Sequence, residues 1–183
     1  KKEGSHCKVC GKVLRKQITV AKLKPTISLT ASSLKMKAGQ STTAFKAAGL
    51  AKGDYVTRVT SGNTGIVKVS SVTKKGAFRL TAGKKAGSTT VKVILASKKS
   101  ASFKVTVQRG VVKTSKITVS TKSVTLKKGT TYRKLASSVK VTPVTSQEKV
   151  TYTSSNKKIV TVTSGGVIKG LKKGNATITI RSG

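Results

Sequence analysis

Apolar and polar residues alternate along most of this chain, in short runs that glycine, serine or asparagine interrupts about every ten residues. Val, Ile and Thr dominate the runs, and a period of two is typical of β-strands with one buried face. One stretch occurs twice: Ser61-Gly-Asn-Thr-Gly-Ile-Val-Lys-Val69 matches Ser154-Ser-Asn-Lys-Lys-Ile-Val-Thr-Val162 at Ser, Asn, Ile, Val and Val. A repeat at a fixed offset indicates a duplicated unit. The sequence therefore predicts an all-β protein with two β-sandwiches in tandem.

The second copy of the repeat belongs to a longer pattern of strands and turns. Its parts are Tyr152, Ser154-Ser-Asn156, Ile159-Val-Thr-Val162, Gly166 and Gly174-Asn-Ala-Thr-Ile-Thr-Ile180. This pattern resembles the bacterial immunoglobulin-like domain of group 2, a module of invasin-type and other bacterial surface proteins. In the first copy, Val59 stands at the aromatic position and Gly87-Ser-Thr-Thr-Val91 replaces the closing motif. The resemblance implies two tandem Ig-like sandwiches.

Three segments follow from these patterns. Residues 1–25 form a leader with a Cys-x-x-Cys motif, which Pro25 closes because proline disfavours a continuing central strand. We expect the first sandwich at residues 26–108 and the second at residues 116–183, with a short linker that limits the freedom between them. Alternation places a set of apolar side chains between the sheets: Val67, Val69, Val91, Tyr152, Val160, Val162 and Ile178.

The two copies differ at their ends. The first closes with an extra apolar-alternating run over residues 101–107, whereas the second reaches Gly183 without one. We therefore expect the second sandwich to be one strand short, with an open edge that recruits strands from elsewhere. Truncation of a longer chain explains this difference. The alternative is donation of a leader strand by a neighbouring molecule, joining molecules into a filament. The candidate donor residues are Lys16, Gln17, Ile18, Thr19 and Val20.

The charge of the chain is strongly positive: 39 Lys and Arg residues stand against 3 acidic residues, which gives a formal net charge of +36. Such a surface attracts polyanions. Most of the basic residues are Lys, which lacks the bidentate fork with which Arg recognises guanine, so we expect no sequence-specific nucleic-acid recognition. Single-strand binding through stacked bases is also disfavoured, because five aromatic residues lie in apolar runs that predict core positions: Phe45, Phe78, Phe103, Tyr132 and Tyr152.

The residues with metal or redox chemistry lie in the leader. His6, Cys7 and Cys10 are three clustered ligands, whereas a structural zinc site needs four. In an oxidising, secreted setting we expect a local disulfide between Cys7 and Cys10, or two free thiols, ahead of zinc, and zinc ahead of redox catalysis, because a thioredoxin-like motif precedes a helix and this one lies in a β context. The acidic residues Asp54 and Glu148 lie in separate predicted loops, where we expect salt bridges to lysines. We therefore predict no catalytic constellation, no metal and no cofactor.

The function expected from these features is structural. We expect a non-catalytic stalk or adhesion module of a secreted or cell-wall-associated protein, because the resembling family has that role. Its lysines would contact anionic wall or host polymers such as teichoic acid, mucin glycans or DNA without specificity. The alternative function is a dedicated polyanion-binding module. The sequence contains no apolar run of 18 residues and predicts no membrane span. No signal peptide is visible, so we expect a piece of a longer protein.

Overall fold

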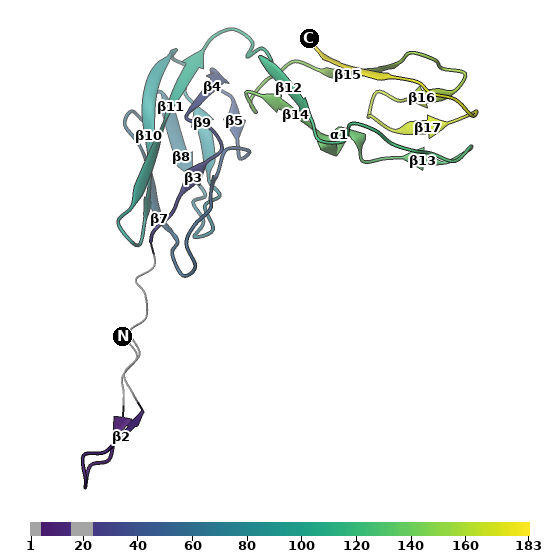
Figure 1. Ribbon diagram of the computed structural model, residues 1–183. Helices are drawn as coiled ribbons and strands as arrows, with labels where there is room; N and C mark the ends of the chain where they lie inside the picture. Colours follow the sequence, from purple (N-terminus) through teal and green to yellow (C-terminus); the bar gives the residue numbers. More distant parts are fainter. Residues whose placement is uncertain (1–4, 16–23) are drawn as a thin grey trace.

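The computed structural model describes residues 5–15 and 24–183, and in these ranges the chain is all-β except for one short helix (Figure 1). The all-β class expected from the alternating pattern is confirmed. Two β-rich parts follow one another along the chain. We call residues 24–108 the N-terminal region and residues 113–183 the C-terminal region.

The larger sheet of the N-terminal region has four strands in the order β4-β11-β10-β7. Strands β10 and β11 form an antiparallel hairpin, and β4 runs parallel to the other edge of β11. A three-stranded sheet, β5-β9-β8, and a two-stranded pair, β3-β6, complete the region. The strands are β3 (Ser28–Leu29), β4 (Ser33–Lys37), β5 (Ser41–Thr42), β6 (Ala47–Ala48), β7 (Val56–Ser61), β8 (Val67–Ser70), β9 (Arg79–Ala82), β10 (Gly87–Leu95) and β11 (Ser100–Gln108).

The core of the N-terminal region is built around three phenylalanines. Phe45 stacks on Phe103 with ring centroids 4.1 Å apart, and Phe78 lies 6.2 Å from Phe103. Alternation along β10 and β11 sends every second side chain of the larger sheet into this cluster. Val67 of β8 and Leu80 of β9 belong to the same cluster, so both sheets contribute to one buried core. Burial of apolar area of this kind is the main stabilising contribution to such a sandwich.

The C-terminal region has shorter sheets and a thinner core. Its sheets are β12-β14, β15-β18 and β13-β17-β16. The elements are β12 (Lys116–Val119), β13 (Thr131–Tyr132), α1 (Leu135–Ser138), β14 (Val139–Thr142), β15 (Val150–Ser154), β16 (Val160–Val162), β17 (Ile168–Gly170) and β18 (Ile178–Ser182). Leu135 and Ile168 are its buried apolar side chains, whereas the N-terminal region buries a cluster of sixteen. The C-terminal region therefore has the weaker hydrophobic stabilisation.

The two regions meet at a joint that residues far apart in the sequence build. Val112 and Thr145 are 1% and 2% exposed there. The hydroxyl of Thr145 donates a hydrogen bond to the main-chain carbonyl of Lys35 in β4. The side-chain amide of Gln40 donates to the carbonyl of Thr145 over 2.9 Å. The loop after β14 is therefore bound to β4 and to the turn that follows β4.

The N-terminal cysteines lie in a small hairpin of their own. Strand β1 (Ser5–His6) pairs with β2 (Val13–Arg15), and the turn between them contains Cys7 and Cys10. The amide of Cys7 donates to the carbonyl of Lys12 over 2.8 Å, and the amide of Gly11 donates to the carbonyl of Cys7 over 2.9 Å. Gly11 has φ +71°, a conformation that favours glycine.

Candidate functional site

The residues predicted to point between the sheets fall into two groups. Val67 and Val91 are 0% exposed in the N-terminal region, while Val69 is half-buried. The predicted core residues of the C-terminal region are all half-buried: Tyr152, Val160, Val162 and Ile178. The same alternation thus gives a closed core in one region and an open one in the other.

Asn63 and Asn156 form the same turn in the two regions. The carbonyl of Asn63 accepts hydrogen bonds from the amides of Ile66 and Val67, and its Oδ1 accepts one from the amide of Gly65. Asn156 has the equivalent hydrogen bonds: its carbonyl accepts from the amides of Ile159 and Val160, and its Oδ1 accepts from the amide of Lys158. Both side chains are therefore occupied in stabilising their own turns and do not contribute a ligand site.

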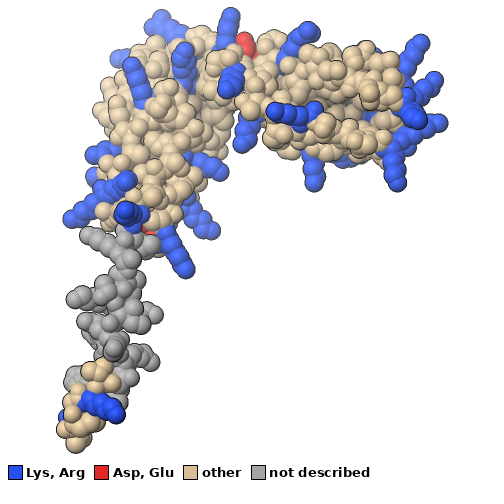
Figure 2. Space-filling view, in the orientation of Figure 1, with Lys and Arg blue, Asp and Glu red and all other residues tan. Residues whose placement is uncertain are grey.

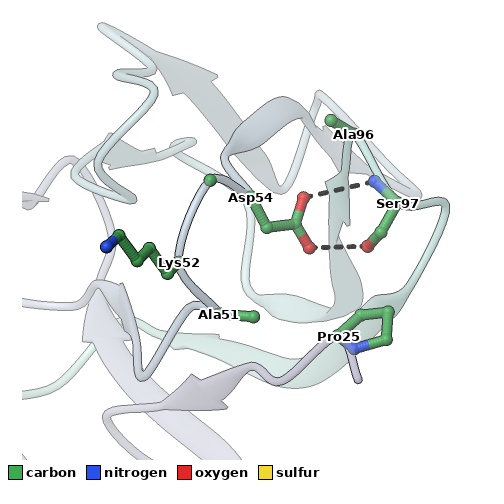
Figure 3. Close-up of a pocket in the computed structure, with 7 residues that line it drawn as sticks. Pro25, Ala51, Lys52, Asp54, Ala96 and Ser97 are labelled. Atoms are coloured by element: carbon green, nitrogen blue, oxygen red, sulfur yellow. Dashed lines mark hydrogen bonds between the residues drawn. The ribbon is translucent and has the colours of Figure 1, made fainter. Parts of the chain in front are cut away.

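Asp54 lies in a small pocket of about 260 Å³ at one end of the N-terminal region (Figure 3). Its carboxylate accepts hydrogen bonds from the hydroxyl of Ser97 over 2.6 Å, from the amide of Ser97 over 3.2 Å and from the amide of Tyr55 over 2.9 Å. The Ser97 hydroxyl is the main cause that lowers the pKa of Asp54 below its usual value. The Asp54 carboxylate therefore joins its own loop to the loop that contains Ser97. Its lowered pKa makes it a weak proton acceptor, so it is poorly suited to act as a general base.

Glu148 has a comparable structural role near the joint. Its carboxylate accepts a hydrogen bond of 2.7 Å from the amide of Thr114. The sequence led us to expect salt bridges from Asp54 and Glu148 to lysines. This expectation is corrected, because the carboxylate oxygens of Asp54 and Glu148 accept hydrogen bonds from main-chain amides and a hydroxyl. These donors are already held close to the carboxylates, whereas a lysine loses side-chain conformational entropy when it forms a surface ion pair.

The two cysteines are free thiols in the structure, so the disulfide considered from the sequence is absent here. Hydrogen bonds from the main-chain amides of Cys10 and Val9, and from the Cys10 thiol, lower the pKa of Cys7. Turn amides stabilise a thiolate in this way. Within residues 5–15 and 24–183, no three His, Cys, Asp or Glu side chains gather as metal ligands would.

The positive charge covers the surface widely. Every lysine in the described ranges is exposed except Lys37, which is half-buried. Figure 2 shows lysine and arginine side chains projecting from both regions on the visible face, over most of the elements. Tyr55 is 40% exposed, and the ammonium of Lys74 lies 5.3 Å from its ring centre. The visible face therefore presents a spread of cations and no single basic stripe.

A groove of about 760 Å³ lies in the C-terminal region. The residues that line it include Ile178 and Ile180 of β18 together with Val124 and Leu126. The proposed donor residues Lys16 to Val20 lie outside the described residues. In the part of the chain that is described, no helix has the length and apolar character of a membrane span.

Comparisons with known proteins give three findings. No protein with a curated description matches the chain. Among solved structures, domains 4 and 5 of the S-layer protein SbsC are 24% identical, with a TM-score of 0.39 over 47% of this chain and 52% of that one. The S-layer protein rSbsC(31-844) is 18% identical, with a TM-score of 0.46 over 93% of this chain and 23% of that one. This chain thus spans about half of the first structure and about a quarter of the second.

The third finding concerns the C-terminal region. Its turn at Asn156, its buried Ile168 and its closing strand β18 lie within the matched segment. Residues 113–183 match the model of the family described as bacterial Ig-like domain (group 2).

Proposed function

We propose that this chain is a non-catalytic structural module of a secreted or cell-surface bacterial protein, in which two Ig-like sandwiches in tandem act as a stalk or spacer. The family match of residues 113–183 supports the surface role. The matching turns at Asn63 and Asn156 support an Ig-like origin for the N-terminal region as well.

The contacts at the joint between the two regions are the main support for the spacer role. A spacer must transmit position from one end to the other, so its units need a fixed relative orientation. Val112 is buried at the joint, and Thr145 and Gln40 connect the loop after β14 to β4 and the turn that follows it. Thr145 is buried, so bending that breaks these hydrogen bonds would leave its polar atoms without partners; the bonds therefore oppose bending at this point.

A distance measurement between the two regions tests the spacer role. Cys7 and Cys10 are first changed to serine, and spin labels are placed on cysteines introduced at the exposed positions Lys75 and Lys173. We expect one narrow distance distribution at both low and high salt, because contacts and not charge repulsion set the orientation. A broad distribution would contradict the spacer role.

A matched pair of variants tests whether the joint is the cause. Thr145→Val keeps the shape of the buried side chain and removes its hydroxyl donor, so we expect a broader distribution. Thr118→Val makes the same substitution at an exposed position of β12 and should leave the distribution unchanged. Equal distributions in the two variants would show that Thr145 does not hold the joint.

The lysine surface favours a second role for the same module. With 39 basic and 3 acidic residues, and with exposed lysines in both regions, the chain attracts anionic polymers. We propose that anionic wall or host polymers bind this surface diffusely and without sequence preference.

A further inference from the structure

Within the spread of cations, the solvent face of the larger sheet in the N-terminal region carries four basic residues in register. Alternation along β4, β10 and β11 turns their apolar residues inward, so the residues between them face solvent. Each of the four strands has one exposed basic residue on this face. These residues are Lys35 on β4, Lys104 on β11, Lys92 on β10 and Arg58 on β7.

The register of the strands places three of these residues on one diagonal line. Lys35 lies beside Thr106, so it is one strand away from Lys104 and two residues further along β11. Lys92 lies opposite Ser102, so it is one strand away on the other side and two residues back along β11. The three residues therefore stand at equal steps, each one strand and two residues from the next.

Arg58 adds a fourth member to this line. It lies opposite Ile94, two residues along β10 from Lys92, which repeats the same step. Neighbouring strands are about 4.8 Å apart and two residues of a strand span about 6.7 Å, so consecutive members have Cα atoms about 8 Å apart. Three such steps give a length of about 25 Å. We call Lys35, Lys104, Lys92 and Arg58 the basic row.

The surroundings of the basic row are polar and carry no negative charge. Strands β4, β7, β10 and β11 contain no Asp or Glu. Asp54 and Glu148, the acidic residues that the structure describes, accept hydrogen bonds from amides and a hydroxyl elsewhere. An anionic chain along the row therefore meets a cation at each step and hydroxyl donors between the steps. The flanking residues with hydroxyl groups are Ser33, Thr60, Thr90, Ser102 and Thr106.

The step of the basic row favours one spacing of charge in a partner. Three backbone bonds of an extended chain span about 3.3–3.6 Å, so a repeat of six bonds spans about 7 Å. A phosphodiester chain with three carbons between its phosphates has this repeat, and the flexible lysine stems cover the small remaining difference. Duplex DNA carries one charge per about 1.7 Å of its axis, so it meets cations anywhere on the surface and gains little from the row.

We propose that the basic row binds a single extended polyol-phosphate chain, which crosses the larger sheet obliquely from β4 to β7 with one phosphate at each basic residue. This inference rests on the proposed attraction of anionic polymers to the lysine surface, and it adds a place and a partner chemistry. The ammonium groups of the three lysines contact phosphates as point charges, and Arg58 contributes a bidentate contact at one end.

An exchange of two residues on β10 tests the row at constant composition and net charge. Thr90→Lys combined with Lys92→Thr moves one cation along the same exposed face, from the row to a position beside Lys104. We expect this double variant to bind 1,3-linked polyglycerol phosphate several-fold more weakly by calorimetry, with a salt slope lower by about 0.7, because one contact is lost. Its affinity for duplex DNA should not change. Equal affinities of parent and variant for polyglycerol phosphate would overturn the proposal.

Two charge-matched variants of the full chain give a second measure. One replaces the four members of the basic row by glutamine. It should lose most of its affinity for polyglycerol phosphate, with a salt slope lower by about 2.8, since four contacts contribute about 0.7 each. The other should keep its affinity within a few-fold, and urea midpoints by circular dichroism check that both variants are folded. The second variant replaces exposed residues of the same region outside the row, Lys46, Lys52, Arg79 and Lys84.

The outcomes separate this inference from the proposed function. Equal losses of polyglycerol phosphate binding in the two charge-matched variants would refute the row and leave the diffuse attraction of polymers in place. The same conclusion follows if the parent chain binds duplex DNA and not polyglycerol phosphate. Failure of the parent chain to bind either polymer would contradict both proposals.

Discussion

At the scale of single residues, Asp54 is the clearest case of a side chain whose surroundings set its chemistry. Hydrogen bonds, first of all from the Ser97 hydroxyl, lower the pKa of its carboxyl group in the folded chain. A lowered folded pKa stabilises the fold fully above the ordinary value of about 3.9, and this contribution is lost as the pH falls to the folded pKa. The chain has only 3 acidic residues, so few other carboxyl groups obscure the effect.

We therefore predict that Asp54→Asn weakens the pH dependence of stability on the acid side. The variant should have a lower urea midpoint than the parent at neutral pH, and this difference should shrink as the pH drops below the ordinary aspartate pKa. Ser97→Ala should change the profile in the same direction, since it removes the strongest donor. The urea midpoint is measured by circular dichroism at each pH. If it changes with pH in parallel for parent and variant, a group other than Asp54 causes the pH dependence of stability.

At the scale of elements, long alternating runs were predictable from the sequence and very short elements were not. The runs around residues 91–95 and 103–107 became β10 and β11, because nine residues of strict alternation define one buried face. Strands β5, β6 and β13 have two residues each, which is too short to show a period. The helix α1 of four residues arises in a segment without a helical pattern.

The groove and the joint show why a candidate site is harder to predict than a fold. Residues Val124-Thr-Leu-Lys-Lys-Gly129 repeat Leu34-Lys-Met-Lys-Ala-Gly39, which contains most of β4. This repeat did not indicate that residues 124–126 lie outside the strands of the C-terminal region. Thr145 lies in a polar loop, and its bond to Lys35 joins residues 110 positions apart, so no local pattern reveals it.

The contrast between the two cores predicts unequal stabilities for equivalent positions. Met36 is 0% exposed, so we expect Met36→Ala to cost the N-terminal region about 2–5 kcal/mol. Leu126 is its half-buried counterpart, and Leu126→Ala should cost on the order of 1 kcal/mol because part of its area is already in water. Hydrogen exchange in urea, which follows each region separately, measures both, and the C-terminal region should open first. Equal losses would mean that the groove is closed in solution.

At the scale of the whole molecule, charge determines how the chain meets its surroundings. A diffuse surface of exposed lysines binds duplex DNA or heparin through counterion release. The logarithm of the affinity should then fall linearly with the logarithm of the salt concentration, by a slope of about 0.9 for each DNA phosphate neutralised. No base sequence should be preferred, because few arginines are present to recognise bases.

Two charge-matched variants separate a diffuse surface from a focused site. Each replaces the same number of exposed lysines by glutamine, one set in each region, and the binding of DNA is compared across salt concentrations. A diffuse surface predicts similar losses of affinity and similar reductions in salt slope, since each lysine acts mainly through long-range attraction. If one set abolishes binding while the other has no effect, the polymer site is local to one region. The two sets are Lys46, Lys52, Lys68, Lys74, Lys84 and Lys92, and Lys127, Lys128, Lys140, Lys157, Lys158 and Lys169.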